Sequence, residues 1–210
     1  MPSAIDLFAG PGGLSLGLKK AGFEVIGAIE LDEDAGETYR HNIGNHTLQM
    51  DITKFGPKEF RFFLEQNRLL EQGETLDLIA GGPPCPGFSL IGRSKISDLI
   101  KKGLFGESKE YRHQFIDDPR NQLFREFVKY VAEFEPRYFI MENVSGMSSY
   151  QIDGDPIVGV IEESFIELGY EVDSEIVTAS QYGVPQDRKR IIFLGTKRGE
   201  KKPNFSPEGD

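Results

Sequence analysis

The stretch Gly81-Gly82-Pro83-Pro84-Cys85-Pro86-Gly87-Phe88-Ser89 follows an apolar run over residues 76–80, and that run predicts a buried strand. The glycines and prolines exclude a helix and force the backbone into a tight, stiff turn. Cys85, the only cysteine of the 210-residue chain, lies at the tip of this turn. A lone cysteine is more often a buried, inert thiol, but a thiol that only packs requires no such scaffold. The pattern therefore favours a reactive thiol, which must ionise beside positive charge or hydrogen-bond donors.

Predicted strands and helices alternate along the rest of the chain. The expected strands span residues 3–8, 24–30, 46–50, 76–80, 137–142, 170–178 and 190–196. The expected helices span residues 14–21, 32–42, 57–72, 119–134 and 157–168. This alternation predicts an α/β fold with a mainly parallel sheet covered by helices on both faces. Residues 90–115 lack a clear period and are too long for a passive connector, so they are either a functional loop or partly disordered.

Length and composition indicate one globular domain with an ordinary core. No apolar run approaches membrane-spanning length, and Met1-Pro2-Ser3 leads directly into a strand, so we expect no signal peptide. One cysteine cannot form an internal disulfide, which fits a reducing cytoplasm.

The net charge of −10 argues against a protein that binds nucleic acid over its whole surface. Basic residues are nevertheless concentrated in two regions. Residues 85–130 hold nine Lys or Arg against six Asp or Glu, and residues 187–202 hold seven against two. A polyanion could be bound there, although charge alone favours simple solvation of the surface.

Residues suited to ligand binding follow successive predicted strands. Gly10-Pro11-Gly12-Gly13 follows the first strand, Glu30 ends the second, and Asp51 follows the third. Cys85 and Glu142-Asn143 follow the fourth and fifth. In a parallel sheet these carboxyl ends meet at one edge, where ligands bind. This coincidence is stronger evidence for a site than any single residue.

The glycine turn has neither the dinucleotide spacing nor the Lys-Ser/Thr of a phosphate loop, and a plain strand-to-helix turn explains it equally well. Glu30 could accept hydrogen bonds from ribose hydroxyls or act as a helix N-terminal carboxylate, a role that Asp32 could already fill. Asp51 could bind an adenine amino group or cap the turn at Thr53. Together the three features suggest an adenosine-containing cofactor without a pyrophosphate.

Glu142 ends the apolar strand Tyr138-Phe139-Ile140-Met141, where partial desolvation favours a protonated carboxyl that could donate to a ring nitrogen. A structural ion pair with an arginine is the less favoured alternative. Alternation places Arg188 and Arg190 on one face of the last strand, where one of them could bind a carboxylate, a phosphate or a base carbonyl. A solvated strand start is the simpler interpretation of these two arginines alone.

In this order, the segments resemble the cytosine-C5 methyltransferases that act on DNA. The motifs extend over nearly the whole chain, and as an ordered set they are highly specific. They are Asp6-Leu7-Phe8-Ala9-Gly10-Pro11-Gly12-Gly13, Glu30, Asp51-Ile52, Pro83-Pro84-Cys85 with Phe88-Ser89, Glu142-Asn143-Val144, and Gln186-x-Arg188-x-Arg190.

The resemblance implies a Rossmann-like, S-adenosylmethionine-dependent methyltransferase fold with a seven-stranded sheet, and it implies no metal. S-adenosylmethionine would be the methyl donor and S-adenosylhomocysteine the product. The implied cofactor-binding residues are Asp6, Phe8, Ala9, Gly10, Gly12, Gly13, Leu14, Glu30, Leu31, Asp51, Ile52, Pro83 and Leu123.

The resemblance also assigns the catalytic residues, with DNA as the partner. Cys85 would add to C6 of cytosine and make C5 nucleophilic. Glu142 would bind N3 and Arg190 the base carbonyl, with Arg188 close by, while Pro84 and Asn143 would shape the pocket. A base that reacts in this way must be flipped out of the duplex. The loop over roughly residues 90–118 would close on it, with Gly92 as a hinge and Ser89, Arg93 and Arg120 on phosphates.

Three departures from the family pattern stand out. Pro86 replaces the more usual glutamine, the loop between Ser89 and Arg120 is long, and the chain stops at Asp210. The family continues into a target-recognition region, so we expect residues 1–202 to be the catalytic domain and residues 203–210 the start of a linker. Alone, this half is expected to bind cofactor weakly and to methylate poorly or not at all. A missing C-terminal region or a second chain would supply target recognition. The alternatives are a methyltransferase acting on cytosine in transfer RNA, and a non-enzymatic or complementing subunit of a split methyltransferase.

Overall fold

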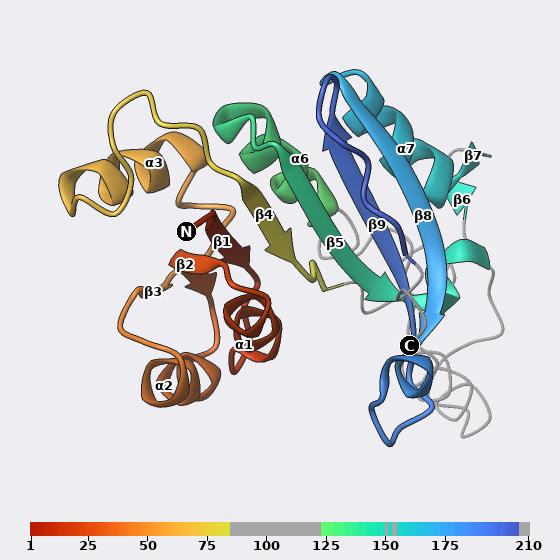
Figure 1. Cartoon of the computed structure of the whole chain (residues 1–210), viewed down its shortest axis with the longest axis horizontal. Helices are drawn as coiled ribbons and strands as arrows, with labels where there is room; N and C mark the ends of the chain where they lie inside the picture. Colours follow the sequence, from red (N-terminus) through yellow and green to blue (C-terminus); the bar gives the residue numbers. More distant parts are fainter. Residues whose placement is uncertain (85–122, 150, 153–154, 206–210) are drawn as a thin grey trace, which may run out of the picture.

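One seven-stranded sheet organises the computed structural model, which describes residues 1–84, 123–149, 151–152 and 155–205. The strand order is β3-β2-β1-β4-β5-β9-β8 (Figure 1). The first five strands in this order, from β3 through β2, β1 and β4 to β5, pair in parallel. Strand β9 lies between β5 and β8 and is antiparallel to both. The strands are β1 Ser3–Leu7, β2 Glu24–Glu30, β3 Thr47–Gln49, β4 Leu78–Gly81, β5 Tyr138–Val144, β8 Tyr170–Thr178 and β9 Lys189–Lys197.

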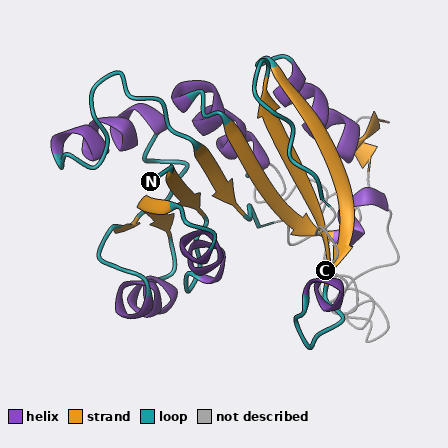
Figure 2. Ribbon diagram, in the orientation of Figure 1, coloured by secondary structure: helices purple, strands orange, loops and turns teal. Residues whose placement is uncertain are grey.

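Helices cover both faces of the sheet (Figure 2). Helices α1 (Gly13–Lys20) and α2 (Glu33–Asn42) pack on the face that carries Ala4, Ala28 and Ala80. Helices α3 (Pro57–Gln66), α6 (Phe124–Phe134) and α7 (Ile157–Ile166) pack on the opposite face. The predicted α/β class and mainly parallel sheet are confirmed. In the described part of the chain, no helix is both long and apolar enough to cross a membrane.

The larger core lies beneath α3, α6 and α7. Helix α6 buries Phe124, Phe127, Tyr130, Val131 and Phe134, a spacing that forms one apolar stripe along the helix. Aromatic rings from three elements meet there, because Phe127 contacts both Phe139 on β5 and Phe165 on α7. This packing holds the middle of the sheet rigid beneath its carboxyl edge.

The order in which successive strands are added to the sheet reverses between β1 and β4. Strands β2 and β3 extend from one side of β1, and β4 and β5 extend from the other. The carboxyl ends of β1 and β4 therefore flank a topological switch point, where α/β sheets bind their ligands. The two strands approach closely there, because a Cβ on Gly81 would overlap the carbonyl oxygen of Leu7.

Several element boundaries differ from the sequence predictions. The helix expected over residues 57–72 ends at Gln66, because Arg68 takes a left-handed φ of +57° and Leu69 bonds back to Leu64. Leu70 is buried in the loop that follows, so its apolar position in the predicted helix reflects packing of that loop. Strand β4 begins two residues later than expected, and α6 begins at Phe124, with residues 119–122 outside the described part. Some short elements were not predicted: the 3-10 helices η3 Ser145–Ser149 and η4 Ala179–Tyr182, and the hairpin of β6 Gln151–Ile152 with β7 Asp155–Pro156.

The segment after β9 runs back across the sheet on the side of α1 (Figure 1). Tyr138 on β5 donates its hydroxyl to the Lys201 carbonyl at 3.1 Å. Lys202 pairs with Asp173 on β8 at 2.8 Å. These contacts lead the chain back toward the carboxyl edge, where the site residues lie.

Candidate active site

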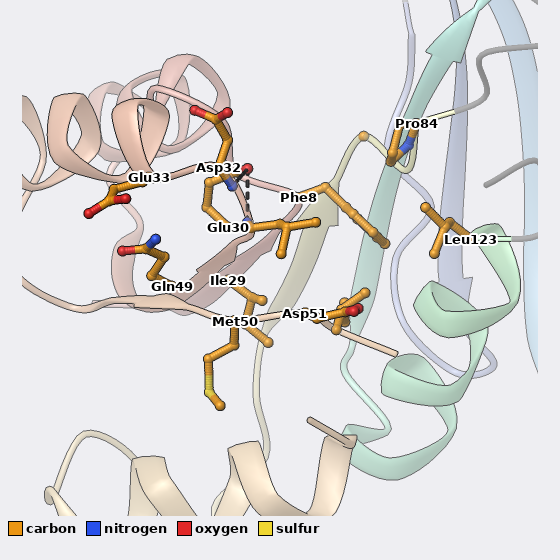
Figure 3. A pocket seen from close by; sticks show the side chains of 13 residues that line it. Phe8, Ile29, Glu30, Asp32, Glu33, Gln49, Met50, Asp51, Pro84 and Leu123 are labelled. Carbon is orange, nitrogen blue, oxygen red and sulfur yellow. Dashed lines mark hydrogen bonds between the residues drawn. The ribbon is translucent and has the colours of Figure 1, made fainter. Parts of the chain in front are cut away.

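A cavity of about 630 Å³ opens at the carboxyl ends of the strands (Figure 3). Glu30 and Asp32 lie at one end of this cavity, and Pro84 and Leu123 lie at the other. Its volume is in the range of small-molecule sites. It is lined by Phe8, Ile29, Glu30, Leu31, Asp32, Glu33, Gln49, Met50, Asp51, Ile52, Gly82, Pro84 and Leu123.

Six of the residues expected to bind cofactor are among this lining: Phe8, Glu30, Leu31, Asp51, Ile52 and Leu123. The glycines of the first turn, with Ala9, Leu14 and Pro83, are not among the lining residues. Ile29, Glu33, Gln49 and Met50 line the cavity without having been predicted. They flank Glu30 and Asp51 in sequence, so proximity to those carboxylates was the signal that could have found them.

Both carboxylate oxygens of Glu30 accept hydrogen bonds from backbone N–H groups at one end of the cavity. Oε2 accepts the backbone N–H of Gly10 at 2.6 Å. Oε1 accepts the N–H groups of Leu31 and Asp32 at 2.9 and 2.8 Å. Capping of α2 is performed by Asp32, which accepts the Ala35 N–H. Glu30 is therefore free of the capping role, and its remaining lone pairs can accept hydroxyl groups of a ligand.

The first turn runs through three left-handed residues. Phe8, Gly10 and Gly12 have φ values of +59°, +56° and +95°. A positive φ is unusual for a bulky residue, and here it occurs where Phe8 enters the cavity lining. Gly12 also has no room for a side chain, because a Cβ there would lie 2.5 Å from Ile43, the residue that follows α2, and 3.0 Å from Tyr39 on α2. The glycines therefore permit both the turn and the close packing of α2.

Asp6 lies in the protein interior rather than in the cavity lining. Ser15 on α1 donates to its Oδ2 at 2.6 Å, and Tyr39 on α2 hydrogen-bonds to Ser15 at 2.8 Å and to His46 at 3.0 Å. Asp6 Oδ1 has no hydrogen-bond partner among the residues that the structure describes. Burial raises the pKa of Asp6 to about 7, opposed by the hydrogen bonds from Ser15. Asp6 thus supports the turn from behind, and the structure gives no contact through which it would touch a cofactor.

Asp51 combines the two roles that its sequence position left open. Its Oδ1 accepts the N–H and hydroxyl of Thr53 at 3.0 and 2.7 Å, and it also lines the cavity. The Thr53 hydrogen bonds, with Lys54 nearby, hold the pKa of Asp51 below its usual value. Together with Glu30, Asp32 and Glu33, Asp51 makes the lining strongly acidic, which suits a cationic ligand.

Glu142 and Arg190 form an ion pair beside this cavity. Arg190 Nε donates to Glu142 Oε1 at 2.7 Å, and Arg190 Nη1 donates to the Lys189 carbonyl. Both side chains are partly exposed, at 32% for Glu142 and 22% for Arg190. The sequence made an ion pair with an arginine the less favoured alternative for Glu142, but the structure contains this contact. It arises because β9 inserts beside β5, a pairing that the local sequence does not reveal.

Asn143 connects the ends of β4 and β5. Its buried side chain donates from Nδ2 to the Pro83 carbonyl at 3.0 Å, while Oδ1 accepts the Val144 N–H at 2.8 Å. The other carboxylate oxygen of Glu142 faces Gly82, since a Cβ built there would lie 3.3 Å from it. Gly82 and Pro84 in turn line the cavity. The Glu142–Arg190 pair therefore lies next to Gly82, which lines the acidic cavity together with Pro84.

Arg188 is exposed on the turn that precedes β9, where its carbonyl accepts the Ala179 N–H. The predictions for Cys85, Ser89, Gly92, Arg93, Arg120 and the loop over residues 90–118 lie outside the described residues. Within the ranges that the structure describes, no group of three His, Cys, Asp or Glu side chains is placed to hold a metal ion.

Comparison with known proteins adds independent findings. The profile of the family described as C-5 cytosine-specific DNA methylase matches residues 3–209. The type II methyltransferase M.DdeI of Desulfomicrobium norvegicum is 40% identical over 92% of this chain and 40% of its own length. M1.HphI of Haemophilus parahaemolyticus is 36% identical over 93% of this chain and 46% of its own length. The chain thus spans less than half the length of these relatives.

Solved structures share the fold. A DNA modification methyltransferase encoded within an E. coli prophage aligns with a TM-score of 0.70 and 32% identity, covering 94% of this chain and 47% of its own. The S. pombe methyltransferase Dnmt2 aligns with a TM-score of 0.66 at 19% identity, covering 98% of this chain and 52% of its own. At that identity the likeness concerns the fold alone.

Proposed function

Because the chain belongs to the C-5 cytosine-specific DNA methylase family, we propose that it carries the catalytic machinery for methylating C5 of cytosine in DNA. One observation supports this most directly. The ends of β4 and β5 are joined by the Asn143–Pro83 hydrogen bond, and the Glu142–Arg190 pair lies beside Gly82 and Pro84 of the acidic cavity. A cofactor pocket and a base-binding pair therefore share one wall.

The cavity fits S-adenosylmethionine by its chemistry. Four carboxylates in its lining suit a ligand with sulfonium and ammonium charges, and Phe8, Ile29 and Ile52 provide apolar surface for an adenine ring. Glu30 would accept the ribose hydroxyls, and Asp51 the adenine amino group. When bound, S-adenosylmethionine supplies an electrophilic methyl group.

Cys85, which follows Pro84 in the sequence, would act as the nucleophile. Its thiolate adds to C6 of the cytosine, and the C5–C6 double-bond electrons make C5 the nucleophile that accepts the methyl group. A base then removes the C5 proton, and the electron pair of that bond reforms the double bond as the thiolate leaves.

Glu142 and Arg190 would hold the cytosine during these steps. Glu142 Oε2 and Arg190 Nη2 make no hydrogen bond to the described residues, so both can meet a base edge while the ion pair persists. N3 of cytosine is an acceptor, so Glu142 would have to carry a proton on Oε2 to donate to it, while Arg190 would donate to the base carbonyl. The cytosine must be flipped out of the duplex before it can reach Glu142 and Arg190 at this edge of the sheet. The thiolate requires a reducing compartment, and we place the activity in a prokaryotic cytoplasm.

Trapping with duplex DNA that contains 5-fluorocytosine tests the proposal. Fluorine cannot leave as a proton does, so the adduct accumulates even when turnover by this chain is slow. With S-adenosylmethionine present, we expect a denaturation-resistant complex that Cys85→Ala abolishes. No adduct from the chain alone, but one in the presence of the remainder of a full-length enzyme, would favour the complementing-subunit alternative. An adduct with 5-fluorocytosine transfer RNA instead of duplex DNA would transfer the assignment to RNA.

Asn143→Ala provides a positioning test within the same assay. Loss of the bond to Pro83 should slow trapping at least tenfold, because the turn that carries the nucleophile loses its tether. The cofactor affinity measured by calorimetry should stay within about twofold, since Asn143 is not in the cavity lining. An equal loss of both would indicate that Asn143 supports only the fold.

A further inference from the structure

The turn between β8 and β9, residues 179–188, is closed by its own hydrogen bonds. The Ala179 N–H donates to the Arg188 carbonyl at 2.9 Å, and the Val184 N–H donates to the Ala179 carbonyl at 3.2 Å. Ser180 Oγ donates to Asp187 Oδ1 at 2.7 Å, bridging the two sides of the turn. Gly183 turns the chain with a φ of +78°. These bonds make residues 179–188 a compact projection of defined shape.

This stiff turn exposes large apolar side chains. Tyr182 is 44% exposed and Val184 is 47% exposed, while residues 180–188 are all exposed. Single exposed apolar side chains are ordinary, but a pair on a rigid projection beside a candidate site indicates a contact surface. The Tyr182 hydroxyl donates to the Phe205 carbonyl at 2.8 Å, which tethers the turn to the segment that crosses the sheet.

Two adjacent cations, Arg188 and Lys189, stand where the turn enters β9, although the chain as a whole is acidic. Arg188 and Lys189 form no ion pair with the described residues, and both are exposed. The acid of the turn, Asp187, is bonded to Ser180. Exposed cations beside exposed apolar side chains suit a polyanion that also offers apolar faces, which is the chemistry of nucleic acid.

The turn projects from the edge of the sheet that carries the Glu142–Arg190 pair (Figure 1). Lys189 pairs with Thr178 where the turn begins, and Arg190 pairs with Val144 on β5 in the next position. A strand of DNA that presents a base to Glu142 must therefore pass close to this turn.

We propose that residues 179–189, the turn and the first residue of β9, form a DNA-contacting element next to the base-binding pair. Arg188 and Lys189 bind phosphates of the strand that carries the extruded base. Tyr182 and Val184 pack against the sugars and bases that flank it. This inference rests on the proposed function and adds to it a contact surface.

Duplex-DNA affinity of the chain, measured by fluorescence anisotropy at several salt concentrations, tests the assignment. Val184→Ser and Tyr182→Ala should each weaken binding about three- to tenfold without changing the salt slope. Lys189→Gln should lower the slope of log K against log [salt] by about 0.9, because one phosphate contact is lost. Tyr182→Phe, which loses only the bond to Phe205, should bind as the parent does.

Arg198→Gln is the matched control, because this exposed arginine follows β9 at the opposite edge of the sheet and should leave both affinity and slope unchanged. Calorimetry with S-adenosylmethionine should give the same Kd for every variant. Parent-like DNA binding by Val184→Ser and Tyr182→Ala overturns the inference while the proposed function stands. A parallel loss of cofactor affinity overturns it too, since the turn would then act through the fold. No DNA binding by any form would count against the proposed function itself.

Discussion

Asp6→Asn replaces a fully buried carboxyl with a neutral side chain of nearly the same shape. Burial beneath α1 raises the pKa of Asp6 from 3.8 to about 7 in the folded chain, and the nearby Glu30 carboxylate adds to this effect. The native state therefore retains a proton that the unfolded chain releases above about pH 4. The stabilising effect of this proton is complete below pH 4 and is lost as pH rises through 7.

The size of the effect follows from the two pKa values. Moving a pKa from 3.8 to about 7 corresponds to about 4 kcal/mol, because each pH unit between them contributes about 1.4 kcal/mol. The asparagine side chain of the variant cannot ionise, and its amide oxygen can still accept the Ser15 hydroxyl. We therefore expect Asp6→Asn to match the parent near pH 4 and to exceed its free energy of unfolding by up to about 4 kcal/mol at pH 8.

Urea unfolding followed by far-ultraviolet circular dichroism at pH 5, 6, 7 and 8 measures this difference without any ligand. Groups whose pKa is lowered in the folded chain, such as Asp51 and Glu135, affect parent and variant equally. Asp34→Asn, at an exposed position in the first turn of α2, is the control and should keep the pH slope of the parent. A constant offset between Asp6→Asn and the parent at all four pH values would refute the reasoning.

Two further predictions concern Gly195 and Glu30. Gly195→Ala should lower the free energy of unfolding by about 3 kcal/mol, because the new Cβ overlaps the buried Phe139 ring. Gly159→Ala, in open space on α7, is the control and should raise the free energy of unfolding by up to about 1 kcal/mol. Chemical denaturation measures both variants, and equal effects would contradict the packing argument. Glu30→Gln places an amide donor against backbone N–H groups such as that of Gly10, so the wall of the cavity loses an acceptor. Calorimetry should therefore show at least tenfold weaker S-adenosylmethionine binding. An unchanged Kd would show that Glu30 does not belong to the binding site.

Much of the architecture could be predicted from local patterns. Apolar strands alternating with amphipathic helices indicate a parallel sheet, and parallel strands all end at one edge. Glu30, Asp51, Pro84 and Glu142 could therefore be placed together without coordinates. The end of the helix at Gln66 could not be predicted, because Leu70 continues the apolar spacing of the helix although it is buried in the loop that follows.

The sequence by itself determined the class of fold, the edge of the sheet that carries the site and the motifs that mark the family, since all of these depend on residues close together in the chain. Only the tertiary structure decided how those residues are used. Insertion of β9 beside β5 pairs Arg190 with Glu142, and packing of α1 and α2 buries Asp6 away from the cavity. Both outcomes depend on strand order and on side chains distant in sequence, which no local periodicity encodes.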